Sequence, residues 1–198
     1  MNNRNFHDAK ANRNGSEIDE RSLKELFENL FFTVHVEKDL NWDDMRRVAT
    51  EFAEKDHSEF DAFVFIIMSH GGDKDVIQGV DGRYIQIEHL MCEFKADNCR
   101  TLRNKPKLFI IQTCRGSFQS TPTSDMGDAD AAFSPDSTLS KGVCPEEADF
   151  LLAFSTAPGY KAFRNEESGS LFVQVCNIGR TCYSLSCGGT SLTFGGIH

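Results

Sequence analysis

The stretch FIIQTCRG, residues 109–116, places a cysteine and an arginine directly after an apolar run that begins at Lys107. Two other short apolar runs, AFVFIIM at 62–68 and DFLLAF at 149–154, have the same aromatic and β-branched character. Such runs are typical of strands that are buried on both faces. Helical segments lie between the run at 62–68 and the run that begins at Lys107. The sequence therefore predicts an α/β fold with a mainly parallel central sheet flanked by helices.

The segment SEIDERSLKELFENL, residues 16–30, is predicted to be a helix. Ser16 and Asp19 stand in the spacing of a capping box, and apolar residues then recur on one helical stripe. Further elements are predicted at four places: a strand at TVHVE (33–37), a helix capped by Asn41, a hairpin around Asp81-Gly82, and a helix from Ile87 to Phe94.

Length, composition and charge limit the classes of protein to which this chain can belong. The chain has 198 residues, 39% of them hydrophobic, and a formal net charge of -9. This size suits one domain, and the acidic balance argues against nucleic acid or a membrane surface as partner. We find no signal sequence and no apolar stretch long enough to span a bilayer. The seven irregularly spaced cysteines fit reduced thiols, so we expect a cytoplasmic protein.

Three apolar runs end in polar turns that contain glycine: SHGG at 69–72, QTCRG at 112–116 and STAPG at 155–159. If the strands are parallel, His70 and Cys114 emerge at the same edge of the sheet. A thiolate beside an imidazole is a nucleophile with its own acid and base, and the backbone N–H groups of Gly71 and Cys114 could bind an oxyanion. A buried cysteine and a structural histidine explain the same residues, and these patterns alone leave both interpretations open.

A larger pattern resembles the caspase family, and in particular its effector members. The histidine of MSHGG precedes the cysteine of QTCRG by about the number of residues that is typical of the family. Other segments match in order from residue 2 to about 175: MNNRNF, NRNGSEID, KPKLFIIQTCRG, DFLLAFSTAPGY and FRNEESGSLFVQ. The resemblance implies an aspartate-specific cysteine endopeptidase of apoptosis, with Cys114 as nucleophile, His70 as acid and base, and no metal or other cofactor.

The resemblance also implies a pocket for the substrate aspartate, formed by Arg13, Gln112 and Arg164. Two guanidinium groups and an amide can hold one carboxylate in a fixed plane. Phe163 would form a wall of the neighbouring pocket, and Asn165 would orient the substrate backbone. A relative that cleaves after Arg or Lys would need an acidic pocket, and the two arginines argue against that alternative.

By the same resemblance the chain divides into four segments. These are a large-subunit-like segment with the dyad (1–116), an acidic intersubunit linker (117–142), part of a small subunit (143–175) and a divergent tail (176–198). In the linker, Asp128 ends the motif DMGD and is the first candidate for maturation cleavage of a zymogen, followed by Asp130 and Asp136. Cysteines in the tail are six and five residues apart, which matches no common zinc spacing.

Some features depart from the family. Thr113 replaces the usual alanine before the nucleophile, and the family's first strand, last small-subunit strands and dimer-forming strand have no counterpart here. We therefore expect little activity from this chain and a weakened homodimer. The expected partners are proteins with exposed aspartate sites and other caspases. The alternative function is a catalytically impaired, truncated homologue that binds and modulates full-length caspases.

Overall fold

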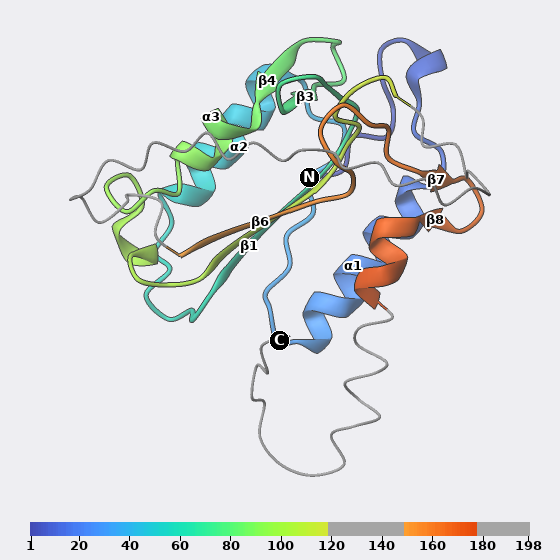
Figure 1. Ribbon diagram of the computed structural model, residues 1–198. Helices are drawn as coiled ribbons and strands as arrows, with labels where there is room; N and C mark the ends of the chain where they lie inside the picture. Colours follow the sequence, from blue (N-terminus) through green and yellow to red (C-terminus); the bar gives the residue numbers. More distant parts are fainter. Residues whose placement is uncertain (119–148, 178–198) are drawn as a thin grey trace, which may run out of the picture.

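A three-stranded parallel sheet lies at the centre of the computed structural model, which describes residues 1–118 and 149–177 (Figure 1). The strands are β1 (Phe63–Met68), β5 (Lys107–Gln112) and β6 (Phe150–Phe154), in the order β1-β5-β6. β1 and β5 pair from Phe63 opposite Lys107 to Met68 opposite Gln112. The three apolar runs are therefore the three strands, as their sequences predict.

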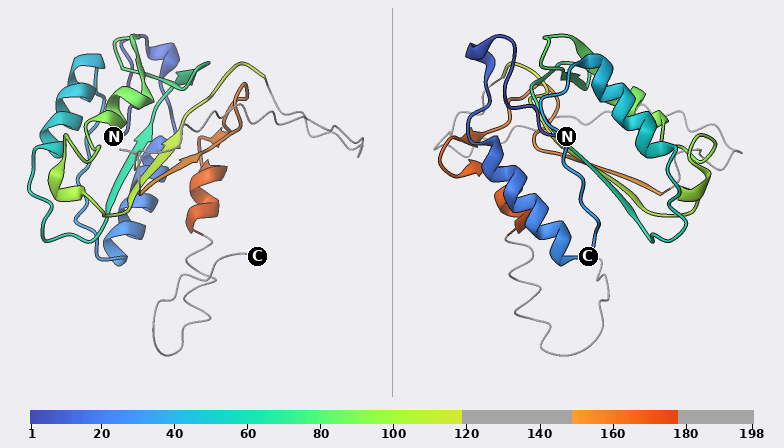
Figure 2. Two further views of the ribbon diagram at one scale, coloured as in Figure 1. Left: turned by 60° about the vertical axis from the view of Figure 1, so that its left-hand side comes forward. Right: turned by 180° about the vertical axis from the view of Figure 1, so that it is seen from behind.

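Helices cover both faces of this sheet, which explains why its strands are continuously apolar. α2 (Trp42–Ala53) and α3 (Ile87–Cys92) lie over one face, and α1 (Ser16–Asn29) with helical residues 171–177 lies over the other (Figure 2). Phe65 and Ile67 of β1 pack in the cluster that includes α2 and α3, whereas Val64 and Ile66 pack in the cluster with α1. None of the helices in the described residues is long and apolar enough to cross a membrane.

A small antiparallel sheet follows β1. It contains β2 (Gly71–Gly72), β3 (Val76–Gln78) and β4 (Tyr84–Gln86), and Gly82 has φ +84° in the turn between β3 and β4. The hairpin predicted around Asp81-Gly82 is confirmed. The remaining short elements are η1 (Ala9–Ala11), η2 (Arg100–Leu102), and the paired strands β7 (Arg164–Asn165) and β8 (Gly169–Ser170).

The start of α1 differs from the prediction. The residue that caps the helix is Gly15, with φ +87°, and it makes no side-chain capping hydrogen bond. Ser16 and Asp19 are both buried inside the first turn, and Asp19 accepts a hydrogen bond from the backbone of Ser170 instead. The capping-box prediction is wrong because the cap lies one residue earlier than the motif requires, at Gly15, and the Ser16 N–H that the motif would pair with Asp19 donates to the Arg13 carbonyl at 3.2 Å.

Residues 33–37 also differ from the prediction, since they form no strand. Next to them, Asn2 makes isolated parallel bridges to Lys38 on one side and Met68 on the other. A strand requires a run of paired residues, and Asn2 supplies only one. A cavity of about 500 Å³ lies beside this segment, and its lining includes neither His70 nor Cys114.

Candidate active site

His70 and Cys114 lie at the same end of the central sheet. Met68 and Gln112 are opposite each other at the ends of the parallel strands β1 and β5, and each candidate follows two residues later. The backbone of Ser69 continues the pairing by donating to the Gln112 carbonyl at 3.2 Å. Both side chains are half-buried. The register therefore gives the two residues equivalent positions on neighbouring chains of the sheet, as the sequence predicts.

The His70 ring is held by a backbone carbonyl and an aromatic neighbour. Its Nε2 lies 2.7 Å from the Ala11 carbonyl oxygen, so Nε2–H donates and Nδ1 is left as the basic nitrogen. The ring centroid is 4.9 Å from that of Phe6. Burial lowers the pKa of His70 below its ordinary value, against the hydrogen bond to Ala11, and the charges of Arg13 and Arg164 lower it further. These influences favour a neutral imidazole at neutral pH.

Gly71 lets the two loops approach each other closely. A Cβ atom built on Gly71 would lie 2.5 Å from the Cys114 carbonyl oxygen and 2.8 Å from Cβ of Thr113, so a side chain has no room. His70 and Gln78 form the hydrogen-bonded pair of the small sheet, with Gln78 N–H donating to the His70 carbonyl at 2.9 Å. Pairs alternate along antiparallel strands, so the Gly71 N–H points away from β3. Within the described residues it therefore takes no part in the pairing of β2 with β3.

Arg13 is buried, with only 1% of its surface exposed. One terminal nitrogen donates to the Asn3 carbonyl at 2.9 Å, but the buried Nε has no hydrogen-bond partner among the described residues. Burial, together with the charge of Arg164, lowers the pKa of Arg13 to about 9, against the opposite effects of Asp19 and Cys114. Arg13 therefore remains cationic at neutral pH without a carboxylate bonded to it in this part of the chain.

Gln112 and Arg164 complete the predicted trio from two other elements. Gln112 ends β5 with 2% of its surface exposed, and its Oε1 is buried without a partner in the described segments. Arg164 begins β7, and its Nε donates to the Asn14 carbonyl at 3.0 Å, next to Arg13. Each arginine is within electrostatic range of His70 and Cys114. The structure thus gathers the trio and the dyad in one region.

Arg115 fastens the nucleophile loop to the loop after β6. Its backbone N–H donates to the Tyr160 carbonyl at 2.9 Å, and its carbonyl accepts from Gly159 N–H at 2.7 Å. Its guanidinium group binds Asp75 at 2.7 Å and lies 3.9 Å from the ring centroid of Phe154. The sequence motif contains Arg115, but this role escaped the sequence reasoning because all four partners are distant in the chain.

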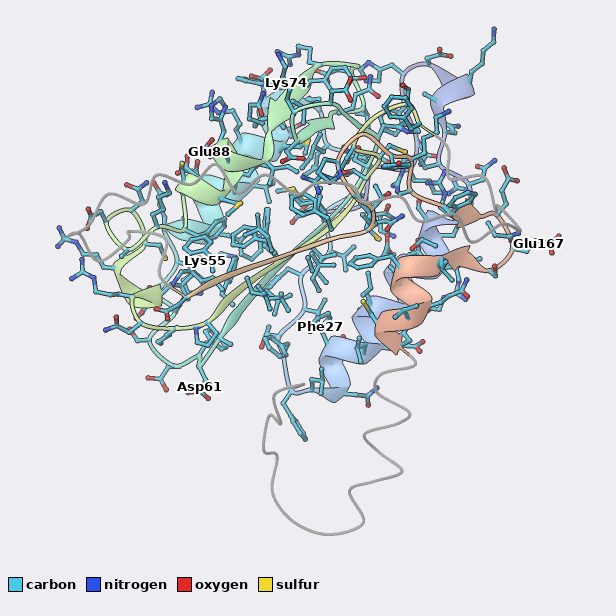
Figure 3. All side chains as sticks on the ribbon, in the orientation of Figure 1. Phe27, Lys55, Asp61, Lys74, Glu88 and Glu167 are labelled. Atoms are coloured by element: carbon cyan, nitrogen blue, oxygen red, sulfur yellow. The ribbon has the colours of Figure 1, made fainter. Side chains whose placement is uncertain are left out.

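The outer residues of the predicted pocket lie at the surface. Phe163 is 60% exposed, so it is not part of the core. Asn165 Oδ1 accepts hydrogen bonds from Glu167 N–H at 2.7 Å and Ser168 N–H at 3.1 Å, so it closes the β7–β8 turn. Glu167 lies at the outer tip of this hairpin (Figure 3). The processing candidates Asp128, Asp130 and Asp136 and the tail 178–198 lie outside the described residues.

Comparisons with known proteins show the family of this chain. A family model described as Caspase domain matches residues 1–177. Caspase-7 of Gallus gallus is 41% identical over 182 residues, covering 90% of this chain and 58% of that protein. Caspase-3 of Bos taurus is 39% identical over 177 residues, covering 88% and 61%. The chain therefore spans about three fifths of the length of these relatives.

The fold is similar as well. The crystal structure of caspase-1 from Spodoptera frugiperda superposes with a TM-score of 0.76 at 31% sequence identity, covering 91% of this chain and 66% of that one. The family match extends over both described segments, and so includes every residue of the dyad and the trio. We conclude that this chain belongs to the caspase family.

Proposed function

We propose that this protein is a cysteine endopeptidase that cleaves peptide bonds after aspartate and acts in programmed cell death. Membership of the caspase family supports cysteine protease chemistry. The aspartate specificity and the roles of individual residues rest on the geometry of this chain. The observation that carries them is the buried cationic Arg13, whose Nε has no partner in the described residues and whose pKa is lowered by the nearby charge of Arg164.

Cys114 is the nucleophile in this mechanism. Its thiol proton moves to Nδ1 of His70, and the sulfur attacks the scissile carbonyl carbon. The oxyanion accepts hydrogen bonds from the backbone N–H groups of Gly71 and Cys114. When the C–N bond breaks, the His70 proton leaves with the amine and a thioester remains. A water molecule then gives up a proton to His70, attacks the thioester and releases the acid and the thiol.

The two arginines and Gln112 select the residue before the cleaved bond. A buried guanidinium group that lacks an anionic partner is unfavourable, and a carboxylate that enters the same space stabilises it. Arginine binds carboxylates in a planar, two-bonded geometry, and the Gln112 amide can donate a further hydrogen bond. A lysine or arginine side chain of a substrate would be repelled here, which supports aspartate and not a basic residue.

Labelling with a peptide electrophile tests the proposal directly. We expect a biotinylated peptide ending in an aspartyl electrophile to modify Cys114, and a matched peptide ending in lysine to react much more slowly. Cys114→Ala should abolish labelling, and His70→Ala should slow it strongly. A protein that is folded by circular dichroism yet shows no preference for aspartate would contradict the proposed activity.

An alternative function is a non-catalytic homologue that binds other caspases. The observation in its favour is β6, which is an edge strand among the described residues, with Leu151 63% and Leu152 38% exposed. An unpaired edge with apolar side chains can add a strand from another chain. Mixing the purified Cys114→Ala protein with a purified active caspase separates the two functions, since only the binding homologue changes the partner's activity.

A further inference from the structure

Asp19 is a buried acidic residue that the proposed mechanism does not use. Its residue surface is 1% exposed, and Oδ1 accepts a hydrogen bond from Ser170 N–H at 2.8 Å. Oδ2 is buried without a hydrogen-bond partner in the described part of the chain. The bond joins the first turn of α1 to β8 across 151 positions of sequence. Asp19 therefore fastens two segments that are far apart in the chain.

The segment that Asp19 fastens is the β7–β8 hairpin, residues 164–170, which begins with Arg164. Two glycines allow the hairpin to lie directly on the start of α1. A Cβ atom on Gly15 would be 2.6 Å from the Asn165 carbonyl oxygen, and one on Gly169, at φ +80°, would overlap Oδ1 of Asp19. Arg164 adds its own bond to the Asn14 carbonyl. The hairpin thus contacts the helix that begins three residues after Arg13.

The charges around Asp19 also link this residue to Arg13 and Arg164. The carboxylate attracts both guanidinium groups and opposes the lowering of their pKa values by burial. In turn, burial raises the pKa of Asp19, while the hydrogen bond from Ser170 and the charges of both arginines oppose that rise. Two arginines with one carboxylate keep one net positive charge. The group can therefore hold two like charges near each other and still attract an acidic side chain.

We propose that Asp19 is a positioning residue for the aspartate pocket, because it holds the hairpin that carries Arg164 against the helix that follows Arg13. This inference rests on the proposed aspartate specificity. Asp19 touches neither His70 nor Cys114 in any hydrogen bond or ion pair of the described residues. Its loss should therefore weaken the binding of aspartyl ligands more than it slows the reaction of the dyad.

The test separates binding from reaction in the full chain. Saturation kinetics with the aspartyl electrophile give the inhibition constant KI and the maximal rate kinact. Asp19→Ala should raise KI about tenfold or more, as expected when a hydrogen bond to a charged group is lost, and leave kinact within about threefold. Asp19→Asn retains an oxygen for the Ser170 N–H and should raise KI less. Glu28→Ala removes an exposed carboxylate of the same helix, paired with Lys24, and serves as the control.

A second measurement does not depend on activity. Hydrogen exchange of the Ser170 amide should be faster in Asp19→Ala than in the wild type or Glu28→Ala, because the amide loses its acceptor. Gly169→Ala, which displaces the carboxylate, should have the same effects on exchange and on KI. If the wild type prefers aspartate but Asp19→Ala leaves KI and exchange unchanged, this inference fails alone. If the wild type shows no preference for aspartate, the proposed function fails and this inference fails with it.

Discussion

The two described segments hold their parts of the site in different ways. Residues 1–118 supply Arg13 and Gln112 from the interior, where both are almost fully buried. Residues 149–177 supply Arg164 and Phe163 from a short hairpin and its approach, with Phe163 largely exposed. In the proposed site, the core thus fixes the dyad and half of the pocket, and the other half depends on how one hairpin is attached. Substitutions in the two segments should therefore separate effects on stability from effects on binding.

The largest expected effect is that of Arg164→Ala. The variant should lose about 2 to 5 kcal/mol of transition-state stabilisation for an aspartyl substrate, because a desolvated carboxylate loses a charged partner. Its free energy of unfolding should change by less than about 1 kcal/mol, since the side chain is only partly buried. Urea unfolding and kcat/KM, with exposed Lys161→Ala as control, check both numbers. An unchanged kcat/KM would remove Arg164 from the pocket.

Arg13→Met should affect both binding and stability. Aspartyl binding should fall as in Arg164→Ala, and the free energy of unfolding should fall by about 1 to 3 kcal/mol. The reason is that the substitution leaves the buried Asn3 carbonyl without its donor and removes a positive charge that offsets the burial of Asp19. Chemical denaturation measures this difference. An unchanged or higher free energy of unfolding would show that the burial cost of the Arg13 cation outweighs these contacts.

The pH dependence of the labelling rate should show whether Arg164, in the second segment, affects the pKa of His70, in the first. Because burial lowers the pKa of His70, the neutral base persists below pH 6.5, and the labelling rate should reach half its maximum at a pH under that value. One pH unit further down, the rate should be about tenfold below its maximum. Arg164 also lowers this pKa, so the midpoint should move to higher pH in Arg164→Ala. A midpoint that stays in place would show that the hairpin charge does not reach the dyad.

Phe163→Ala should have a small effect. An exposed ring contributes little to the folded state, so the free energy of unfolding should change by about 0.5 kcal/mol or less. The KM for peptides with an apolar residue next to the aspartate should rise by a few fold, whereas kcat should be preserved. Steady-state kinetics with matched apolar and polar peptides measure this. Equal changes for both peptides would argue against a pocket wall.

Cleavage between the two segments should change stability least. An active effector caspase should cut after Asp128, or secondarily after Asp130 or Asp136, and mass spectrometry identifies the site. The two products should stay together, because the β5–β6 pairing and the bond between Asp19 and Ser170 are not interrupted. Their thermal midpoint should lie close to that of the intact chain. The absence of any cut within 117–142 would argue against maturation by this route.

The parts of the fold that could be predicted are those that a local pattern encodes. Continuous apolar runs identified the three central strands, and their parallel order placed His70 and Cys114 at one edge. The hydrogen bond between His70 and the Ala11 carbonyl could not be predicted, because every residue has a backbone carbonyl and the sequence does not show which one is used. Asp19 was misread for a related reason, since a local capping pattern cannot show a partner 151 residues away.

Gly71 has a consequence for comparing relatives of this chain. The Cys114 carbonyl and the Thr113 side chain occupy the space that any side chain at this position would need. In a homologue that keeps the histidine and the cysteine but carries a larger residue here, one of the two loops must shift, which would displace the proposed oxyanion donor. The residue type at position 71 can therefore be used to predict which homologues are catalytically active and which are not.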